Sequence, residues 1–397
     1  MESFNFIRSG NLPNNLRILL IHPHLHLFGG SEKLTKILIN ELDGLGYEVV
    51  VLSGGKASAD IPVSPRVKYE VITDVFTKIP SDVILSIRSE KILNIIYSVD
   101  DVISRYKPDV CLVMIQEPIY VIATKLADPR MGTALYIHYP FEEELTSNNV
   151  YVFLTLYRFP HLYEGLYRIA DLHMTNSNYT ASALYKSFGI ESNVTYPAID
   201  WDYFKKELDL TEDRGNVILT VGRFVPQKRH DVLLNWFKRY IKPEVPDAEL
   251  VIVGVPDMRF LEYYERLKKL SSEVEGVTLV DRVLTPTEMM KYYRTAKVYV
   301  HLRIGEHFGM APVEAMSQGA IPILPERSGL AEVVTSGRDG FVANNDDDLL
   351  KYVMSVLKMP KNELTEIRKF AYRRAWYFNP DRFAKEVIHY LKIISKK

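Results

Sequence analysis

Hydrophobic residues gather in short runs along the chain, and between these runs they recur at helical spacing. The first run, Arg17 to His22, predicts a buried strand, because short continuous apolar segments are typical of parallel strands covered on both faces. The next segment predicts a helix that ends at Gly46, since its apolar positions share one face: Leu34, Ile37, Leu38, Leu42 and Leu45. Tyr47 to Ser53 predicts a second strand, so the chain begins with a strand–helix–strand unit.

The same alternation continues through the rest of the chain. Further strands are predicted at 110–115, 133–138, 172–175 and 193–196 and, beyond a polar stretch at 197–216, at 217–222, 248–253, 277–280, 298–302 and 320–324. Thr285 to Glu288 predicts a capping box, and a last helix is predicted from Pro380 to Ile394. We therefore predict an α/β fold of two doubly wound domains, residues 1–200 and 201–378, facing across a cleft and followed by a C-terminal helix at 379–397.

Composition narrows the class of protein. The chain of 397 residues is 47% hydrophobic, which is enough for two cores. A net charge of −1 gives no general attraction to nucleic acid, so we expect no nucleic-acid partner. Cys111 is the only cysteine, so no internal disulfide can form. No apolar run is long enough to span a membrane and the first residues do not resemble a secretory signal, so we expect a cytoplasmic protein.

Two glutamates mark the loop and helix after the strand predicted at 298–302. Glu306 lies in the loop, and Glu314 lies in a short helix that has Pro312 in its first turn. Ligands of open α/β sheets bind beyond the carboxyl ends of the strands, and the N–H groups of a helix start attract anions. We expect both glutamates to face a crevice suited to a phosphorylated ligand with hydroxyl groups. The alternative is an ordinary solvated helix start, where acidic residues are common.

Two further strand-end loops carry residues suited to a phosphorylated ligand. Arg223 and Lys228 follow the strand at 217–222; a guanidinium fork and a flexible ammonium could hold a diphosphate without a metal. Their alternative is a solvated basic loop. Gly29 and Gly30 follow the first strand, where the missing Cβ permits either close approach to a ligand or a tight turn.

Histidines offer weaker signals. His22, His24 and His26 could form a metal cluster, but no acidic or histidine partners follow at ligand-like spacing, so no metal site is expected. His138 ends the strand at 133–138, and a lone histidine in that place is more often structural than catalytic.

Taken in order, these motifs resemble the retaining glycosyltransferase family 4, which has the GT-B fold of two Rossmann-like domains. The resemblance covers nearly the whole chain and rests on Gly29–Glu32, Tyr136–Pro140, Asn176–Thr180, Tyr196–Phe204, Gly222–Lys228 and Glu306–Glu314. Within the family, Ile137–Pro140 and Glu306–Gly309 are most similar to mannosyltransferases that extend lipid-linked oligosaccharides. The region between Asp60 and Asp109, on the acceptor side in this family, matches no motif.

The resemblance implies a role for each motif. Arg223 and Lys228 would neutralise the leaving nucleoside diphosphate, where preorganised charge contributes most to the rate. The other implied donor contacts are Glu306 and the backbone amides of Phe308, Gly309 and Met310 for the sugar, Glu314 for the ribose, His138 near the reacting carbon, and Gly29 and Gly30 for the diphosphate and acceptor. No metal or other cofactor is implied, and the C-terminal helix at 379–397 would pack back on the N-terminal domain.

The implied activity is transfer of a hexose, with retained configuration, from a UDP- or GDP-linked donor to a glycan acceptor, most simply a polyprenyl-linked one. It would serve N-glycan or surface polysaccharide assembly. A sugar-nucleotide 2-epimerase of the same fold is the alternative enzyme. A retaining glycosidase would also use two carboxylates but has no need of Arg223 and Lys228. A non-catalytic binding module would have no need of the whole polar set.

Residues 148–168 are rich in aromatic and basic side chains, and two interpretations are open. Rings and cations of this kind suit a peripheral contact with the cytoplasmic face of a membrane, where a polyprenyl-linked acceptor would lie. The same rings could instead fill the core of the N-terminal domain. Lys78, Arg88 and Lys91 form a second candidate for membrane contact.

Overall fold

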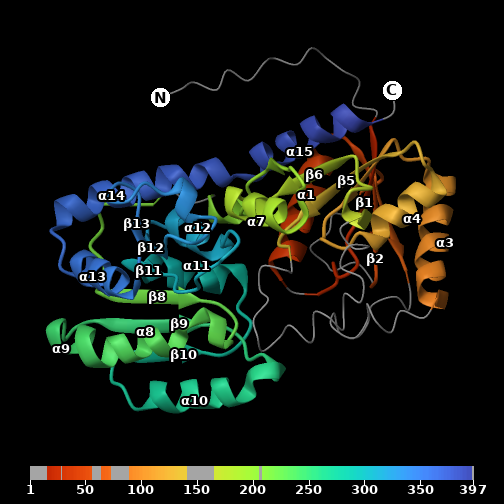
Figure 1. Ribbon diagram of the computed structural model, residues 1–397. Coiled ribbons are helices and arrows are strands. Elements are labelled where there is room, and N and C mark those ends of the chain that lie inside the picture. The colour runs from red at the N-terminus through yellow and green to blue at the C-terminus, as the bar shows by residue number, and fades with distance from the viewer. Residues whose placement is uncertain are drawn as a thin grey trace. The chain divides into compact units, whose positions relative to one another are not determined.

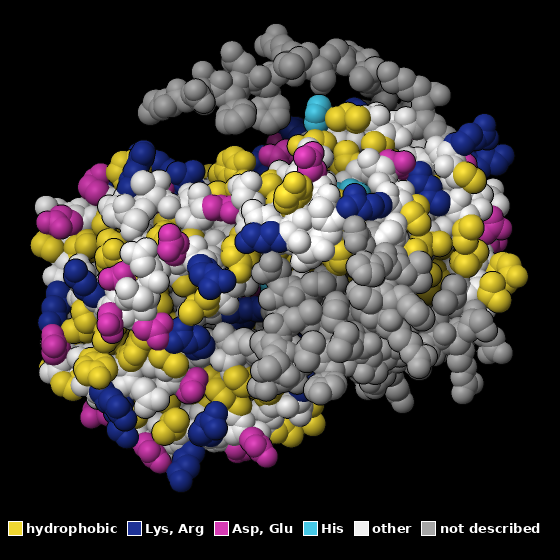
Figure 2. Space-filling model, viewed as in Figure 1, with side chains coloured by type: hydrophobic (Ala, Val, Ile, Leu, Met, Phe, Trp, Pro, Cys, Tyr) yellow, Lys and Arg dark blue, Asp and Glu magenta, His cyan; other side chains and the backbone are white. Residues whose placement is uncertain are grey.

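The chain divides into two compact units that alternate strands and helices (Figure 1). The computed structural model describes residues 16–27, 29–55, 64–72, 89–140, 165–204 and 208–395. Unit 1 comprises residues 1–174 and 384–397, and unit 2 comprises residues 175–383. Over the face shown in Figure 2, Lys and Arg side chains are intermixed with Asp and Glu, as the net charge of −1 leads one to expect.

The first sheet has seven strands in the order β3-β2-β1-β4-β5-β6-β7. The strands are β1 (Arg17–Ile21), β2 (Glu48–Ser53), β3 (Val67–Val71), β4 (Val110–Val113), β5 (Gly132–Ile137), β6 (Leu172–Thr175) and β7 (Asn193–Val194). Ile18 pairs in parallel with Val49 on one side and Val110 on the other. The order reverses between β1 and β4, which is the doubly wound arrangement that the sequence predicts.

Helices α1 (Gly30–Gly44), α3 (Ser89–Tyr106), α4 (Ile119–Ala127) and α7 (Asn178–Phe188) connect these strands. The central strands β1 and β4 are almost wholly buried, which explains their continuous apolar sequences. Cys111 on β4 is buried, and burial raises the pKa of its thiol to about 12, so it is a core residue.

The second sheet has six parallel strands in the order β10-β9-β8-β11-β12-β13. They are β8 (Val217–Val221), β9 (Glu249–Val253), β10 (Val277–Val280), β11 (Val298–Val300), β12 (Ile321–Pro325) and β13 (Phe341–Ala343). The order reverses between β8 and β11, so the loops after these two strands border the place where ligands of doubly wound sheets bind.

The helices that accompany the second sheet follow the alternation of its strands. They are α8 (His230–Trp236), a π-helical turn (Phe237–Ile241), α9 (Lys242–Glu244), α10 (Leu261–Ser272), α11 (Pro286–Thr295), α12 (Met310–Ser317), α13 (Asp346–Leu357) and α14 (Lys361–Ala375), with short 3₁₀ turns between several of them. Thr285 and Glu288 form the predicted capping box of α11. Helix α15 runs from Pro380 to Ile394, as the sequence predicts.

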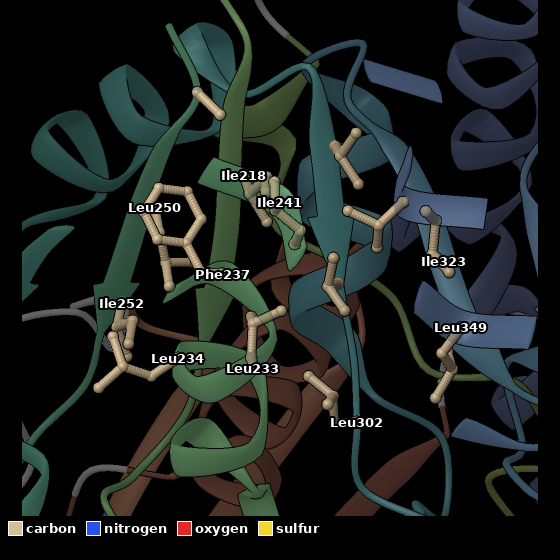
Figure 3. Packing of buried hydrophobic residues seen from close by; sticks show 14 of the residues in the cluster. Ile218, Leu233, Leu234, Phe237, Ile241, Leu250, Ile252, Leu302, Ile323 and Leu349 are labelled. Atoms are coloured by element: carbon tan, nitrogen blue, oxygen red, sulfur yellow. The ribbon is translucent and has the colours of Figure 1, made fainter. Parts of the chain in front are cut away.

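Two hydrophobic clusters cover the faces of the second sheet. One joins Ile218 and Leu250 to Phe237 and to α10 and α13 (Figure 3). The other joins the neighbouring strand residue Leu219 to α11, α12 and α14. Successive strand residues point to opposite faces, so each strand contributes to both cores.

Strands β3 and β13 were not predicted from the sequence. Both lie at an edge of their sheet, and edge strands need not be buried on both faces. Lys68 and Glu70 interrupt the apolar pattern of β3, and β13 has only three residues.

The observed division between the units lies at residue 174, earlier than the boundary expected at residue 200. The reason is the start of α7, which is bound within unit 2. Glu332 accepts hydrogen bonds from the backbone N–H groups of Asn178 and Tyr179, and Ser177 caps the helix through its hydroxyl. Residues of α15 from 384 onward belong to unit 1, where Lys392 lies over the ring of Tyr47.

Some predictions about membrane contact fall where the structure gives no description. Of the stretch 148–168, residues 148–164 lie outside the described residues, as do Lys78, Arg88 and the side chain of Lys91. In the described part of the chain, no helix combines the length and the hydropathy that crossing a membrane requires.

Candidate functional site

The loop after β8 brings a lysine to the carboxyl edge of the second sheet. A 3₁₀ turn, Pro226–Lys228, leads to Arg229, which has a positive φ of 56° and precedes α8. The stem of Lys228 lies against the backbone of Gly222: a Cβ at that glycine would come within 3.1 Å of Lys228 Cδ. Gly222 therefore lets Lys228 cross the end of its own strand.

Lys228 meets a carboxylate from the loop after β11. Its Nζ lies 2.6 Å from Oε2 of Glu306, although the two residues are 78 positions apart. The same oxygen accepts a second hydrogen bond, at 3.0 Å, from Nε2 of His301 at the end of β11. Lys228 and Glu306 thus form a direct ion pair, and His301 binds the same carboxylate oxygen.

The charges in this group are mutually dependent. Burial raises the pKa of Glu306, but the charge of Lys228 and the hydrogen bond from His301 outweigh burial and hold that pKa well below its usual value. Glu306 is therefore a carboxylate at neutral pH. Its other oxygen, Oε1, has no hydrogen-bond partner among the residues that the structure describes, so it remains able to accept one from a hydroxyl group.

The loop that carries Glu306 is clamped at several points. Ser177 donates a hydrogen bond of 2.6 Å to the carbonyl of His307, and the N–H of Gly329 donates to the carbonyl of Glu306 at 2.8 Å. A Cβ at Gly329 would come within 1.8 Å of the His307 carbonyl oxygen, so only glycine fits there. Phe308 anchors the loop in the core, 5.4 Å from the ring of Phe378.

The chain then turns into α12. Gly309 has a positive φ of 90°, which other residues rarely adopt, and Met310 begins the helix. The first N–H groups of a helix have no partner within it and attract anions or hydroxyl oxygens. This places the predicted amides of Phe308, Gly309 and Met310 in one loop with Glu306.

Glu314 lies inside unit 2 and is 7% exposed. Its Oε2 accepts a hydrogen bond of 2.8 Å from the hydroxyl of Tyr293. Burial raises the pKa of Tyr299, and the negative charges of both Glu314 and Glu306 raise it further, so this ring lies near both carboxylates. The two glutamates therefore belong to one region but have different partners, and the ribose contact of Glu314 stays a prediction.

The side chain of Arg223 is 61% exposed and contacts Asp257 rather than Glu306. Its Nη1 donates to Asp257 at 2.9 Å, and Arg259 donates to the same carboxylate. The hydrogen bond from Arg259 is the main reason that the pKa of Asp257 falls to about 2. The structure thus pairs Lys228, but not Arg223, with Glu306. Arg223 would have to leave Asp257 to contact a ligand.

The remaining predicted residues lie in unit 1. Gly29 precedes α1 with extended backbone, and a Cβ there would meet the flexible carboxylate of Glu32. Nε2 of His138 lies 3.1 Å from the carbonyl of Met114, and its ring lies 4.9 Å from that of Tyr136. Burial lowers the pKa of His138 to about 4, so the ring is neutral at pH 7. Gly30 is the first residue of α1.

Three histidines, His22, His24 and His26, follow β1. Nε2 of His24 lies 3.7 Å from a carboxylate oxygen of Glu117, and burial lowers the pKa of His22 to about 3. Within the described ranges, no group of three or more His, Cys, Asp or Glu side chains is placed to hold a metal ion.

Sequence reasoning missed His301 and the clamp made by Ser177. His301 sits at the end of an apolar run, and Ser177 contributed only to the family resemblance. The one signal that could have indicated His301 is the presence of a polar residue at the end of an apolar strand.

The comparisons with known proteins identify the second half of the chain. Residues 204–374 match the family model described as glycosyl transferases group 1. These residues form a glycosyl transferases group 1 domain. The group 1 domain contains the whole Lys228, Glu306 and His301 arrangement, and the match confirms the resemblance that the motifs predict.

Two relatives carry the same printed name, GDP-Man:Man(3)GlcNAc(2)-PP-Dol alpha-1,2-mannosyltransferase. The protein of Dictyostelium discoideum is 25% identical over 297 residues, which cover 65% of this chain and 58% of the relative. The human protein is 27% identical over 244 residues, which cover 57% of this chain and 49% of the relative. The chain thus spans about half the length of the curated relatives it matches.

The solved structure of Anabaena Alr3699/HepE in complex with UDP and glucose superimposes with a TM-score of 0.72 and covers 96% of this chain and 100% of that one. At 16% identity this likeness shows the fold alone. The chain has two Rossmann-like sheets, and the second of them lies within the group 1 domain. Together with this structural likeness, the two sheets confirm the predicted GT-B fold.

Proposed function

We propose that this chain is a retaining hexosyltransferase that takes its sugar from a nucleoside diphosphate donor. The observation that carries the proposal is the contact between Lys228 and Glu306 at the point where the strand order of unit 2 reverses. A cation for the leaving diphosphate and a carboxylate for sugar hydroxyls are what such a transfer needs in one place. The group 1 domain match supports the same conclusion.

Each residue has a defined task in this proposal. Lys228 stabilises the negative charge that develops on the leaving diphosphate, and the exposed Arg223 turns from Asp257 to join it. Oε1 of Glu306 accepts a hydrogen bond from a sugar hydroxyl, while Glu314 holds the ribose. In unit 1, neutral His138 contacts the sugar near its reacting carbon, and Gly29 and Gly30 allow the loop to approach the diphosphate.

The donor and acceptor are proposed from the printed names of the relatives. Those names specify GDP-mannose and a dolichol-linked oligosaccharide, so we propose GDP-mannose as the donor and a polyprenyl-diphosphate glycan as the acceptor. A UDP-linked donor and a surface polysaccharide acceptor are the remaining choices. A lipid-linked acceptor would bring the chain to the cytoplasmic face of a membrane, with residues 148–168 as the proposed contact.

We further propose that the transfer needs no metal, because Lys228 and Arg223 supply the positive charge themselves. Retention of configuration is then explained by attack from the side of the leaving group, with a phosphate oxygen taking the acceptor proton. The bond from the anomeric carbon to the phosphate oxygen breaks as the bond to the acceptor oxygen forms.

A transfer assay tests the proposal. Purified protein is incubated with radiolabelled GDP-mannose, UDP-glucose or UDP-N-acetylglucosamine and a short polyprenyl-diphosphate oligosaccharide, and label is measured in the lipid fraction. We expect label from one donor and release of its nucleoside diphosphate in equal amount.

The same assay without acceptor separates the alternatives. A 2-epimerase would change the sugar of the donor with no acceptor present, and none of the relatives reported above is named as one. A glycosidase would release free sugar from a glycan without any nucleotide. Absence of labelled lipid with every donor would overturn the transferase proposal for these acceptors.

A further inference from the structure

His301 is fixed in place by the second sheet. It follows β11 directly, its backbone N–H donates to the carbonyl of Ile323 at 2.9 Å, and it is 4% exposed. Its side chain has one hydrogen-bond partner in the described structure, Oε2 of Glu306 at 3.0 Å. The ring therefore connects a rigid strand to the carboxylate of a loop residue.

The chemistry of this contact defines the position of the proton. Burial lowers the pKa of His301, and the nearby charges of Lys228 and Arg303 lower it further, which outweighs the effect of Glu306. A neutral imidazole carries its proton on one nitrogen only. Because Nε2 faces a carboxylate oxygen, the proton must be on Nε2, where it is donated to Glu306.

Lys228 and His301 share one oxygen of Glu306 but differ in freedom. The ammonium of Lys228 ends a flexible stem from a loop, whereas His301 is buried at a strand end. A diphosphate that binds Lys228 competes with Glu306 for the ammonium. His301 has no such competitor, so its hydrogen bond can persist while the lysine turns.

We infer that His301 is a positioning residue, which holds Oε2 of Glu306 so that Oε1 stays directed at the sugar hydroxyls after Lys228 has turned to the diphosphate. This inference rests on the proposed function. It assigns to Lys228 the leaving group and to His301 the orientation of the carboxylate. A histidine is suited to this task because its ring has few rotamers and its neutral form adds no charge that would compete for the diphosphate.

Kinetics of two substitutions test the inference. His301→Leu removes the donor, while His301→Gln places an amide N–H at a similar distance from the backbone. A hydrogen bond to a charged group corresponds to about 10–100-fold, so we expect His301→Leu to lose that much kcat and His301→Gln to recover most of it. Affinity for free GDP, measured by calorimetry, should change less than about twofold in both. His173→Leu, on β6 in unit 1, is the control for loss of a histidine.

A stability measurement tests the same hydrogen bond without any activity. In His301→Gln the carboxylate of Glu306 keeps a second donor, so its pKa stays lower than in His301→Leu. A carboxylate with a depressed pKa stabilises the fold above its unfolded pKa and loses that contribution as pH falls. Both variants share the ordinary unfolded pKa of about 4.5, so the advantage of Gln over Leu should stay constant from pH 7 to about pH 5 and shrink as pH falls further, through the depressed pKa values of the folded state. Neither variant contains an imidazole at position 301. Both retain the neighbouring charged or titratable groups, Lys228, Arg303 and His230, so these groups contribute equally to both variants.

The outcomes separate the two claims. Wild-type protein without transfer activity would contradict the proposed function, while the pH dependence of the Gln and Leu variants would still test the hydrogen bond. A His301→Leu variant with wild-type kcat, or a Gln to Leu difference in stability that stays constant from pH 5 to pH 2.5, would overturn the role of His301. Equal loss of GDP affinity in both variants would mark His301 as a structural residue and also overturn it.

Discussion

Replacing Lys228 by methionine should destabilise unit 2 by a measurable amount even without ligand. The substitution keeps most of the apolar stem that lies against Gly222 and removes the ammonium 2.6 Å from Glu306. Among the residues that the structure describes, the carboxylate is then left with His301 as its remaining donor. A partly buried charge that loses its counter-charge must be stabilised by its surroundings or take up a proton.

The magnitude follows from the burial of the pair. Breaking a fully buried ion pair by removing one partner typically costs about 3–5 kcal/mol. Lys228 and Glu306 keep 19% and 14% of their side-chain exposure and His301 still donates, so we expect a loss of about 2 kcal/mol. Lys358→Met is the matched control: Lys358 pairs with Glu244 at 2.5 Å, but both side chains are more than half exposed. That pair should contribute about 0–1 kcal/mol.

Tryptophan fluorescence isolates this effect to unit 2. All three tryptophans of the chain, Trp201, Trp236 and Trp376, belong to that unit. Urea unfolding followed by their emission gives the free energy of unfolding of unit 2 for each variant. The double variant Lys228→Met/Glu306→Gln removes both charges and should be more stable than Lys228→Met alone.

Two results would refute this reasoning. Equal, small losses in the free energy of unfolding for Lys228→Met and Lys358→Met would mean that the pair of Lys228 and Glu306 stabilises the protein no more than a surface ion pair does. A double variant less stable than Lys228→Met by the full cost of Glu306→Gln would show that the two side chains are not coupled.

Three further predictions concern activity and pH. Lys228→Ala and Glu306→Ala should each lower turnover by about 10²–10³ while the protein stays folded by circular dichroism, and near-wild-type turnover would remove either assignment. Transfer should continue in EDTA, whereas loss that added Mg²⁺ restores would contradict the metal-free mechanism. Burial lowers the pKa of His22 to about 3 and of His230 to about 4, so the unfolded chain binds more protons below pH 6.5. Thermal unfolding should therefore shift to lower temperature as pH falls from 6.5 to 4, and His230→Gln should weaken this dependence while the exposed His389→Gln should not.

The fold was predictable because its strands are buried on both faces. Continuous apolar runs such as Val110 to Ile115 allow no other simple placement, and their alternation with helical segments implies parallel sheets. Edge strands such as β3 could not be predicted in this way, because they are less completely buried. The assignment of α7 to unit 2 could not be predicted either, because the start of this helix is bound by Glu332, more than 150 residues away in the sequence.

The site was predictable only as a neighbourhood. Glu306 and Lys228 both follow predicted strands of the second domain, and ligands of doubly wound sheets bind beyond the carboxyl ends of the strands, so both were expected in the same half of the molecule. That Lys228 pairs with Glu306 while Arg223 pairs with Asp257 depends on loop geometry that no local pattern encodes. The hydrogen bond from Tyr293 to Glu314 likewise joins separate helices through the core.

A crystal structure of the protein with GDP-mannose or its nonhydrolysable analogue tests the central claim most directly. The account predicts diphosphate oxygens within hydrogen-bonding distance of Nζ of Lys228, a sugar hydroxyl on Oε1 of Glu306, and His301 still bound to Oε2. Nucleotide bound at another place on unit 2, such as the hollow lined by Thr211, Gly337 and Lys361, with the Lys228 to Glu306 contact undisturbed, would contradict it.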